Sequence, residues 1–273
     1  MISRLDRRFK SLKKGGRKAL IPFVTAGDPQ PDVTVNLMHA LVKAGADVLE
    51  LGIPFSDPMA EGPTIQRACE RALAHKVSLR DVLGMVKNFR EKDAETPVVL
   101  MGYLNPIEVV GYETFAREAV TAGADGVITV DLPPEEAEDY LAAFKTHGLD
   151  PVFLLAPTST KERISRIAAV ARGFVYYVSL KGITGASHLD MNEVRSKLSE
   201  IRKHVSLPLA VGFGIKDAET AAAVAQVADA VVVGSALVDR IADLADQPDK
   251  ILETIPTFLS SLRAAMDKEA MTA

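Results

Sequence analysis

The chain has 273 residues, of which 48% are hydrophobic and 25% are charged, and its formal net charge is −4. This composition is ordinary for a globular protein with a large core and gives no reason to expect nucleic acid or an anionic membrane as a partner. The single cysteine, Cys69, excludes an internal disulfide framework, fits a reducing compartment and is expected to serve in packing.

The N-terminal segment, Met1 to Lys18, is rich in Arg and Lys but carries apolar residues at helical spacing. Ile2, Leu5 and Phe9 belong to this pattern, which predicts an amphipathic helix. The segment lacks the apolar core of a secretory signal, and no apolar run approaches the ~20 residues of a membrane span. We therefore expect a cytoplasmic protein.

A short phrase recurs along the rest of the chain. Ala44-Gly45-Ala46-Asp47 precedes one apolar run, and similar phrases end at Asp125 and near Asp229. In each phrase a helical pattern ends, the chain turns at a glycine or small residue, and a strand begins. Such a repeated helix-to-strand loop implies parallel strands joined by helical crossovers.

The predicted strands are short, nearly continuous apolar runs, typical of strands that are covered on both faces. They are Leu20–Thr25, Val48–Gly52, Val98–Met101, Gly126–Val130, Val152–Leu154, Phe174–Val178, Leu209–Val211 and Ala230–Val233. The helical patterns are Val33–Lys43, Ile65–His75, Leu79–Arg90, Tyr112–Thr121, Pro134–Thr146, Lys161–Ala171, Met191–His204, Ala218–Val227, Ala236–Ile241 and Pro248–Lys268.

Eight strands with intervening helices predict an α/β fold, a single (β/α)8 TIM barrel over residues 1–273 with an extra N-terminal helix and additional peripheral helices. A doubly wound open sheet stays possible, because periodicity alone does not show that a sheet closes.

Two carboxylates stand out at the predicted C-terminal end of the second strand. Glu50 interrupts the apolar strand, and Glu61 lies in the turn-rich loop that follows it. Charges are seldom buried without a partner or a task, and barrel enzymes work at the C-terminal ends of their strands. The pair is therefore a candidate acid/base pair. The alternatives are a structural buried carboxylate at Glu50 and a solvated loop acid at Glu61.

Glycine-rich loops follow the last three strands. Gly212-Phe213-Gly214 and Gly234-Ser235 follow strands seven and eight, where glycines and free N–H groups favour a phosphate over simple tight turns. The loop Ser179–Ser187, which includes Thr184 and Gly185, has the composition of a mobile lid. No lysine occupies a Walker-type position.

The segment Leu49 to Pro63, with the sequence LELGIPFSDPMAEGP, closely resembles the signature of the tryptophan synthase alpha subunit family. The segments PFVTAGDP at Pro22, GITG at Gly182 and GFGI at Gly212 match further motifs of the same family in the same order. The resemblance extends over nearly the whole length of the chain.

The resemblance implies a (β/α)8 lyase of L-tryptophan biosynthesis. Such an enzyme splits indole-3-glycerol phosphate into indole and glyceraldehyde 3-phosphate by acid/base retro-aldol chemistry. It implies no cofactor and no metal in this chain, and a beta subunit that carries PLP as partner in an α2β2 heterotetramer. Its rim loops, with Asp57 and Asp131 among them, are the expected contact with that partner.

The resemblance also implies roles for individual residues. Glu50 is the main acid/base, Glu61 interacts with the indole N–H, and Tyr176 and Thr184 support them. The implied phosphate-binding residues are Gly185, Gly214, Gly234 and Ser235. The implied indole pocket consists of Phe23, Met101, Ile128, Leu154 and Phe213, each of which is also an acceptable barrel-core residue.

Three alternative functions share parts of this pattern. A stand-alone lyase that releases indole would share every catalytic residue. A non-catalytic subunit that only binds the phosphate ligand would have no need of both Glu50 and Glu61. A sugar-phosphate isomerase is disfavoured, because the ends of strands one and five, Leu20–Ala26 and Val152–Ala156, contain no aspartate.

Overall fold

The computed structural model describes residues 2–179, 190–212 and 214–270. Its strands are β1 Ala19–Thr25, β2 Leu49–Gly52, β3 Val98–Gly102, β4 Gly126–Thr129, β5 Asp150–Leu155, β6 Val175–Val178, β7 Leu209–Gly212 and β8 Ala230–Val233. They are all parallel and form a closed barrel in chain order, because β1 also pairs with β8. The predicted barrel is confirmed, and the alternative of an open sheet is wrong.

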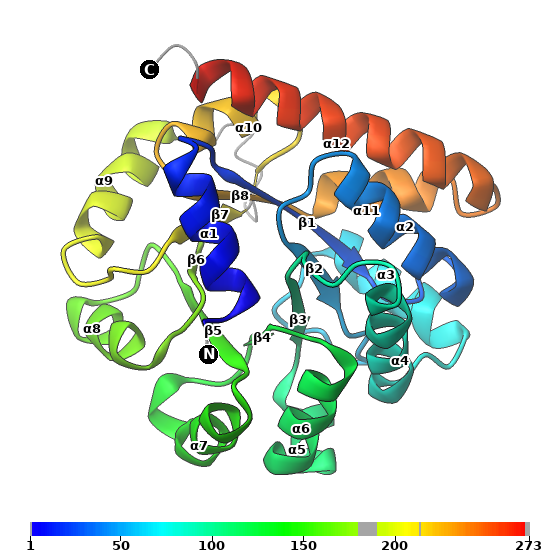
Figure 1. Cartoon of the computed structure of the whole chain (residues 1–273), viewed down its shortest axis with the longest axis horizontal. Helices are drawn as coiled ribbons and strands as arrows, with labels where there is room; N and C mark the ends of the chain where they lie inside the picture. Colours follow the sequence, from blue (N-terminus) through cyan, green and yellow to red (C-terminus); the bar gives the residue numbers. More distant parts are fainter. Residues whose placement is uncertain (1, 180–189, 213, 271–273) are drawn as a thin grey trace.

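Helices surround the barrel (Figure 1). They are α1 Arg4–Lys14, α2 Pro31–Lys43, α3 Pro63–Ala74, α4 Leu79–Arg90, α5 Leu104–Val110, α6 Tyr112–Ala122, α7 Glu138–His147, α8 Lys161–Val170, α9 Met191–Ile201, α10 Ala218–Ala225, α11 Ser235–Asp243 and α12 Pro248–Ala270. Within the described ranges, no helix is long and apolar enough to cross a membrane.

Two helical predictions need correction. The helix α5 was not predicted, because Leu104–Val110 is short and contains a proline. The pattern predicted as one helix over 134–146 is split into a 3-10 turn, Pro134–Glu136, and α7. Ala137 separates them with φ −95° and ψ 13°, which lies outside the helical region.

Alternation along the strands sorts side chains into two cores. On β2, Leu49 and Leu51 point outward and pack with the helices, whereas Val48, directly before the strand, belongs to the barrel interior. Glu50 lies between the two leucines and therefore points into the barrel. The interior of the barrel is a packed layer of apolar side chains rather than a channel.

The helix α1 closes the N-terminal end of the barrel. Leu5, Phe9 and Leu12 are buried among the interior residues, and Ile2, which precedes the helix, is 56% exposed. Gly126 and Gly173 leave room for Leu5, because a Cβ at either position would approach its Cδ1 to 3.3 and 2.9 Å. The end of the barrel opposite to α1 is consequently the one open to a ligand.

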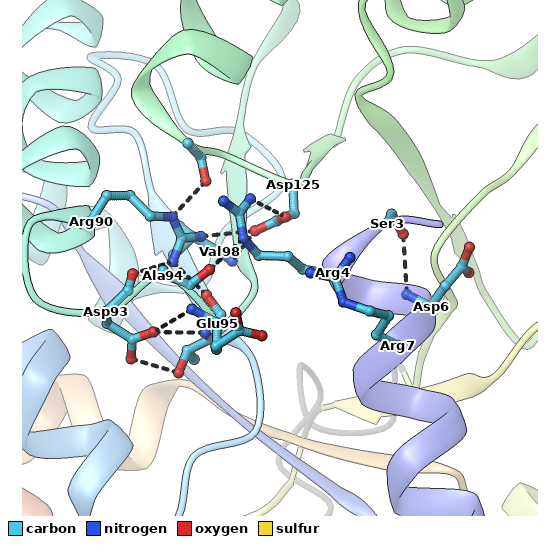
Figure 2. Close-up of polar contacts among 12 residues, drawn as sticks. Ser3, Arg4, Asp6, Arg7, Arg90, Asp93, Ala94, Glu95, Val98 and Asp125 are labelled. Carbon is cyan, nitrogen blue, oxygen red and sulfur yellow. Dashed lines mark hydrogen bonds and ion pairs between the residues drawn. The ribbon is translucent and has the colours of Figure 1, made fainter. Parts of the chain in front are cut away.

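The aspartates of the recurring helix-to-strand loops bind backbone groups at this closed end of the barrel. Asp47, Asp125 and Asp229 each accept a backbone N–H from the preceding strand in the barrel at 2.9 Å. Each carboxylate also pairs with arginine: the partners of Asp125 are Arg90 and Arg4, each at 2.9 Å (Figure 2). These pairs join strands to helices and lie far from the working face, so we assign them to stability.

Candidate functional site

A cavity of about 500 Å³ opens at the C-terminal ends of the strands. Parallel strands bring all these ends to one side, so that loops far apart in sequence share a wall. The cavity has an apolar body with a few polar groups, as small-molecule sites do. The predicted site residues that line it are Phe23, Glu50, Glu61, Met101, Leu154, Tyr176, Gly214, Gly234 and Ser235.

Glu50 lies at the floor of the cavity. It is held between two strands, with Phe23 as its register partner on β1 and Val99 on β3. The side chain is 1% exposed, and its Oε2 has no hydrogen-bond partner among the described residues. Burial, and secondly the negative charge of Glu61, raise the pKa of Glu50 to about 8. Glu50 therefore holds a proton at neutral pH.

Glu61 enters the cavity from the loop between β2 and α3. Its side chain is partly exposed, and burial raises its pKa to about 7. The two carboxyl groups are near enough for the charge of Glu61 to act on Glu50. Because the pKa of Glu50 is the higher of the two, Glu50 suits a proton donor and Glu61 an acceptor.

Tyr176 of β6 forms another part of the wall. Its ring lies directly over Gly212 of β7, where a Cβ would be 2.7 Å from the Tyr176 Cζ. The absence of a side chain at Gly212 therefore lets the tyrosine lie flat against the strand. Burial, followed by the charges of Glu50 and Glu61, raises the pKa of Tyr176 well above its ordinary value, so the hydroxyl stays protonated.

The apolar wall differs in part from the predicted indole pocket. Phe23, Met101 and Leu154 line the cavity, whereas Ile128 is fully buried in the barrel interior and does not line it. Met101 and Ile128 are register partners, but tilted strands place paired residues at different depths along the barrel axis. Val130, two residues further along the chain, lines the cavity instead. Phe213 lies outside the described residues.

The start of α11 lines the cavity through Gly234 and Ser235. Gly234 is the N-cap and has no side chain with which to cap the helix, and Ser235 is the first helical residue. The first N–H groups of a helix have no partner inside the helix and attract anions. Gly214 faces the same cavity with φ +76°, a conformation that favours glycine. Thr184 and Gly185 lie outside the described residues.

Several cavity residues were missed by the sequence reasoning. Inward alternation could have identified the apolar ones on strands, Val178 and Val232. The loop between β5 and α8 adds the polar residues Thr158 and Thr160, and the first turn of α8 adds Arg163. Their only sequence signal was their place after a strand. Among the side chains that the structure describes, no three His, Cys, Asp or Glu residues gather as a metal site would require.

Comparisons with known proteins agree with this geometry. The sequence model of the family described as "Tryptophan synthase alpha chain" matches residues 9–267. The tryptophan synthase alpha chain of Thioalkalivibrio sulfidiphilus is 64% identical over 97% of this chain and 100% of its own length. That of Nitrosococcus oceani is 59% identical over 97% of this chain and 98% of its own length.

Solved structures show the same likeness. Tryptophan synthase subunit alpha from Legionella pneumophila superposes with a TM-score of 0.93 at 51% identity, covering 98% of this chain and 100% of the other. A chain from tryptophan synthase of M. tuberculosis in an aminoacrylate-bound form gives 0.85 at 37% identity, covering 97% and 99%.

Proposed function

The chain belongs to the tryptophan synthase alpha chain family, and from this premise we propose which of its residues perform the reaction. The chain is a lyase of L-tryptophan biosynthesis that cleaves indole-3-glycerol phosphate to indole and glyceraldehyde 3-phosphate. We propose that Glu50 and Glu61 are its acid/base pair. The observation that carries this proposal is the pair of carboxyl groups at one apolar cavity with pKa values raised to about 8 and about 7.

The first step of the proposed mechanism is protonation of the indole ring carbon that bears the glycerol chain. Glu50 donates this proton, and Glu61 takes up the proton of the ring N–H, so that the ring becomes a neutral imine. The apolar walls and buried position of Glu50 keep the donor protonated until the substrate arrives.

In the second step the carbon–carbon bond breaks. Its electron pair returns to the ring, the ring nitrogen recovers a proton from Glu61, and the adjacent hydroxyl loses its proton to Glu50 as the aldehyde forms. Both carboxyl groups thus return to their starting protonation states. Tyr176 supports the ring from the neighbouring wall.

The phosphate of the substrate is proposed to bind at Gly214, Gly234 and Ser235, with Gly185 joining them from a segment outside the described residues. The glycine N-cap of α11 and the left-handed backbone at Gly214 support this assignment. Phe23, Met101 and Leu154 are proposed to hold the indole ring. Thr184 and Phe213 keep their sequence-based assignments as predictions.

The partner of this chain is the tryptophan synthase beta subunit, and PLP belongs to that subunit rather than to this chain. We propose the α2β2 heterotetramer as their assembly. A cytoplasmic location is part of the proposal, on the basis of the family relationship. We also propose that residues 1–273 form a single domain, since α1 and α12 both pack on the barrel.

The test is release of indole from indole-3-glycerol phosphate by the purified chain and its variants. Glu50→Gln keeps the shape of the side chain but cannot donate the same proton, so kcat should fall by ~10²- to 10⁴-fold. Glu61→Asp should lower kcat, and Glu61→Ala should lower it further, because a carboxylate displaced by about 1 Å can cost ~10²-fold. Binding of glycerol phosphate should change little in all three. Near-normal turnover in Glu50→Gln would contradict the proposed roles.

Addition of the beta subunit distinguishes the role of an alpha subunit from that of a stand-alone lyase. Activation of the chain by the beta subunit supports the role of an alpha subunit, whereas an isolated chain that is already at full speed would support the stand-alone enzyme. A chain that binds glycerol phosphate but releases no indole with or without the partner would be the non-catalytic activator.

A further inference from the structure

The loop that carries Glu61 has little regular structure of its own. It runs between β2 and α3 without a helix or strand, and its internal bonds are local turns, such as Glu61 N–H to the Pro58 carbonyl at 3.0 Å. A side chain that must meet a ring N–H needs a better-defined position than such turns provide. Its position therefore depends on contacts that fix the loop to the barrel.

Tyr103, directly after β3, reaches this loop at two points. Its hydroxyl oxygen accepts the backbone N–H of Ala60 at 2.9 Å, one residue before Glu61. Its ring stacks on Phe55, near the beginning of the loop, with centroids 5.1 Å apart and planes at 25°. The tyrosine is 5% exposed, and the adjacent Leu104 N–H is fixed by the Asp131 carboxylate at 2.8 Å. The loop is thus tied to the neighbouring strand through one anchored side chain.

Gln66 holds the backbone on the other side of Glu61. Its side-chain Nε2 donates to the carbonyl oxygen of Glu61 at 2.9 Å from the first turn of α3. That end of α3 is itself fastened to α11 by a bond from the Thr64 hydroxyl to Asp239 at 2.8 Å. Neither Gln66 nor Tyr103 lines the cavity, so neither is placed to touch the substrate.

We propose that Tyr103 and Gln66 are positioning residues that clamp the backbone on both sides of Glu61 and so set the carboxylate against the ring N–H. This inference rests on the proposed role of Glu61. The Tyr103 hydroxyl binds the backbone before Glu61, and the Gln66 amide binds the backbone carbonyl of Glu61 itself. The backbone is thus fixed, and only the Glu61 side chain is left to adjust to the substrate. Loss of either contact should loosen Glu61 without changing the floor of the cavity or the anion site.

The first test uses substitutions that remove one polar group each. Tyr103→Phe keeps the ring and its stacking on Phe55, and Gln66→Met keeps the length of the side chain. Each should lower kcat by about 10- to 100-fold, the scale expected for a displacement of up to about 1 Å. KM and the affinity for glycerol phosphate should change less than threefold. Tyr112→Phe, which removes a hydroxyl that among the described residues donates to Glu108 at the periphery, is the matched control and should leave kcat unchanged.

A double-mutant cycle separates positioning from general stability. In a Glu61→Ala background, Tyr103→Phe should cause no further loss of kcat, because the group that it positions is already gone. A loss of equal size in both backgrounds, or wild-type kcat in both Tyr103→Phe and Gln66→Met, would overturn the clamp. Full activity of Glu61→Ala alone would instead remove Glu61 from the mechanism, so the two failures can be told apart.

Discussion

The ring of Tyr176 occupies the space that a side chain at Gly212 would need. A Cβ at Gly212 would lie 2.7 and 2.9 Å from the Cζ and Cε1 of the tyrosine and closer still to its hydroxyl. At this point β7 is an ordinary parallel strand, so its backbone does not itself require a glycine. Glycine is required at position 212 because the Tyr176 ring packs against it. The relationship links a glycine with no chemistry of its own to the wall of the active site.

The substitution Gly212→Ala should accordingly displace Tyr176 and lower both stability and turnover. Overpacking in a core typically costs about 1–3 kcal/mol, so we expect a lower Tm together with a lower kcat. The control is Gly84→Ala on α4, where an added Cβ meets no atom within 4 Å. That variant should match the parent in kcat, and its Tm should be equal to or slightly above that of the parent, because alanine is favoured over glycine inside a helix. A Gly212→Ala enzyme with the parent's kcat would show that Tyr176 can move without cost.

The pH dependence of kcat/KM should be a narrow bell. Activity should rise with pH through about 7, as Glu61 loses its proton, and fall through about 8, as Glu50 loses the proton that it must donate. These limbs belong to the interacting pair rather than to either residue alone.

The alkaline limb offers a sharper check. The charge of Glu61 is the second cause of the raised pKa of Glu50. In Glu61→Gln the residual activity should therefore fall at a lower pH than in the parent. An alkaline limb that stays in place would mean that another group controls it.

The stability of the fold should also depend on Glu50. Its pKa is raised from 4.5 to about 8 in the folded chain, so between these pH values the folded protein holds a proton that the unfolded chain has released. Stability therefore decreases as pH rises through this window. Glu50→Gln removes this effect, and its gain in Tm over the parent should grow from pH 5 to pH 8. A Tm difference that is constant over this range would contradict the burial of an unpaired carboxyl group.

The contribution of α1 can be measured with two substitutions near the start of the chain. Leu5 is fully buried under the barrel, and Ile2 is 56% exposed. Leu5→Ala should lower the free energy of unfolding by about 2–5 kcal/mol, because the resulting cavity is enclosed by the barrel interior. Ile2→Ala should have an effect near zero. Equal effects in urea unfolding would mean that α1 does not close the barrel as the structure indicates.

The sequence alone predicted the alternation of helices and strands, and it singled out Glu50 and Glu61, which the structure brings to one cavity. Both signals are local: the strand and helix periods repeat within a few residues, and a carboxylate inside an apolar run is visible without knowledge of its neighbours. The recurring phrase ending at Asp47 and Asp125 likewise predicted the loops correctly, although not the backbone N–H groups that these carboxylates accept.

The tertiary structure decided everything that depends on the distance between segments. Closure of the barrel follows from pairing of β1 with β8, which no local pattern encodes. In the sequence, Ile128 and Met101 are both apolar residues of predicted barrel strands. Because the strands are tilted, Ile128 lies below the cavity whereas Met101 lines its wall. The contact of Tyr103 with Ala60 spans 43 positions in the chain. Such contacts are set by packing of the whole fold, so residues that position a catalytic group from a neighbouring strand become visible only once the barrel has closed.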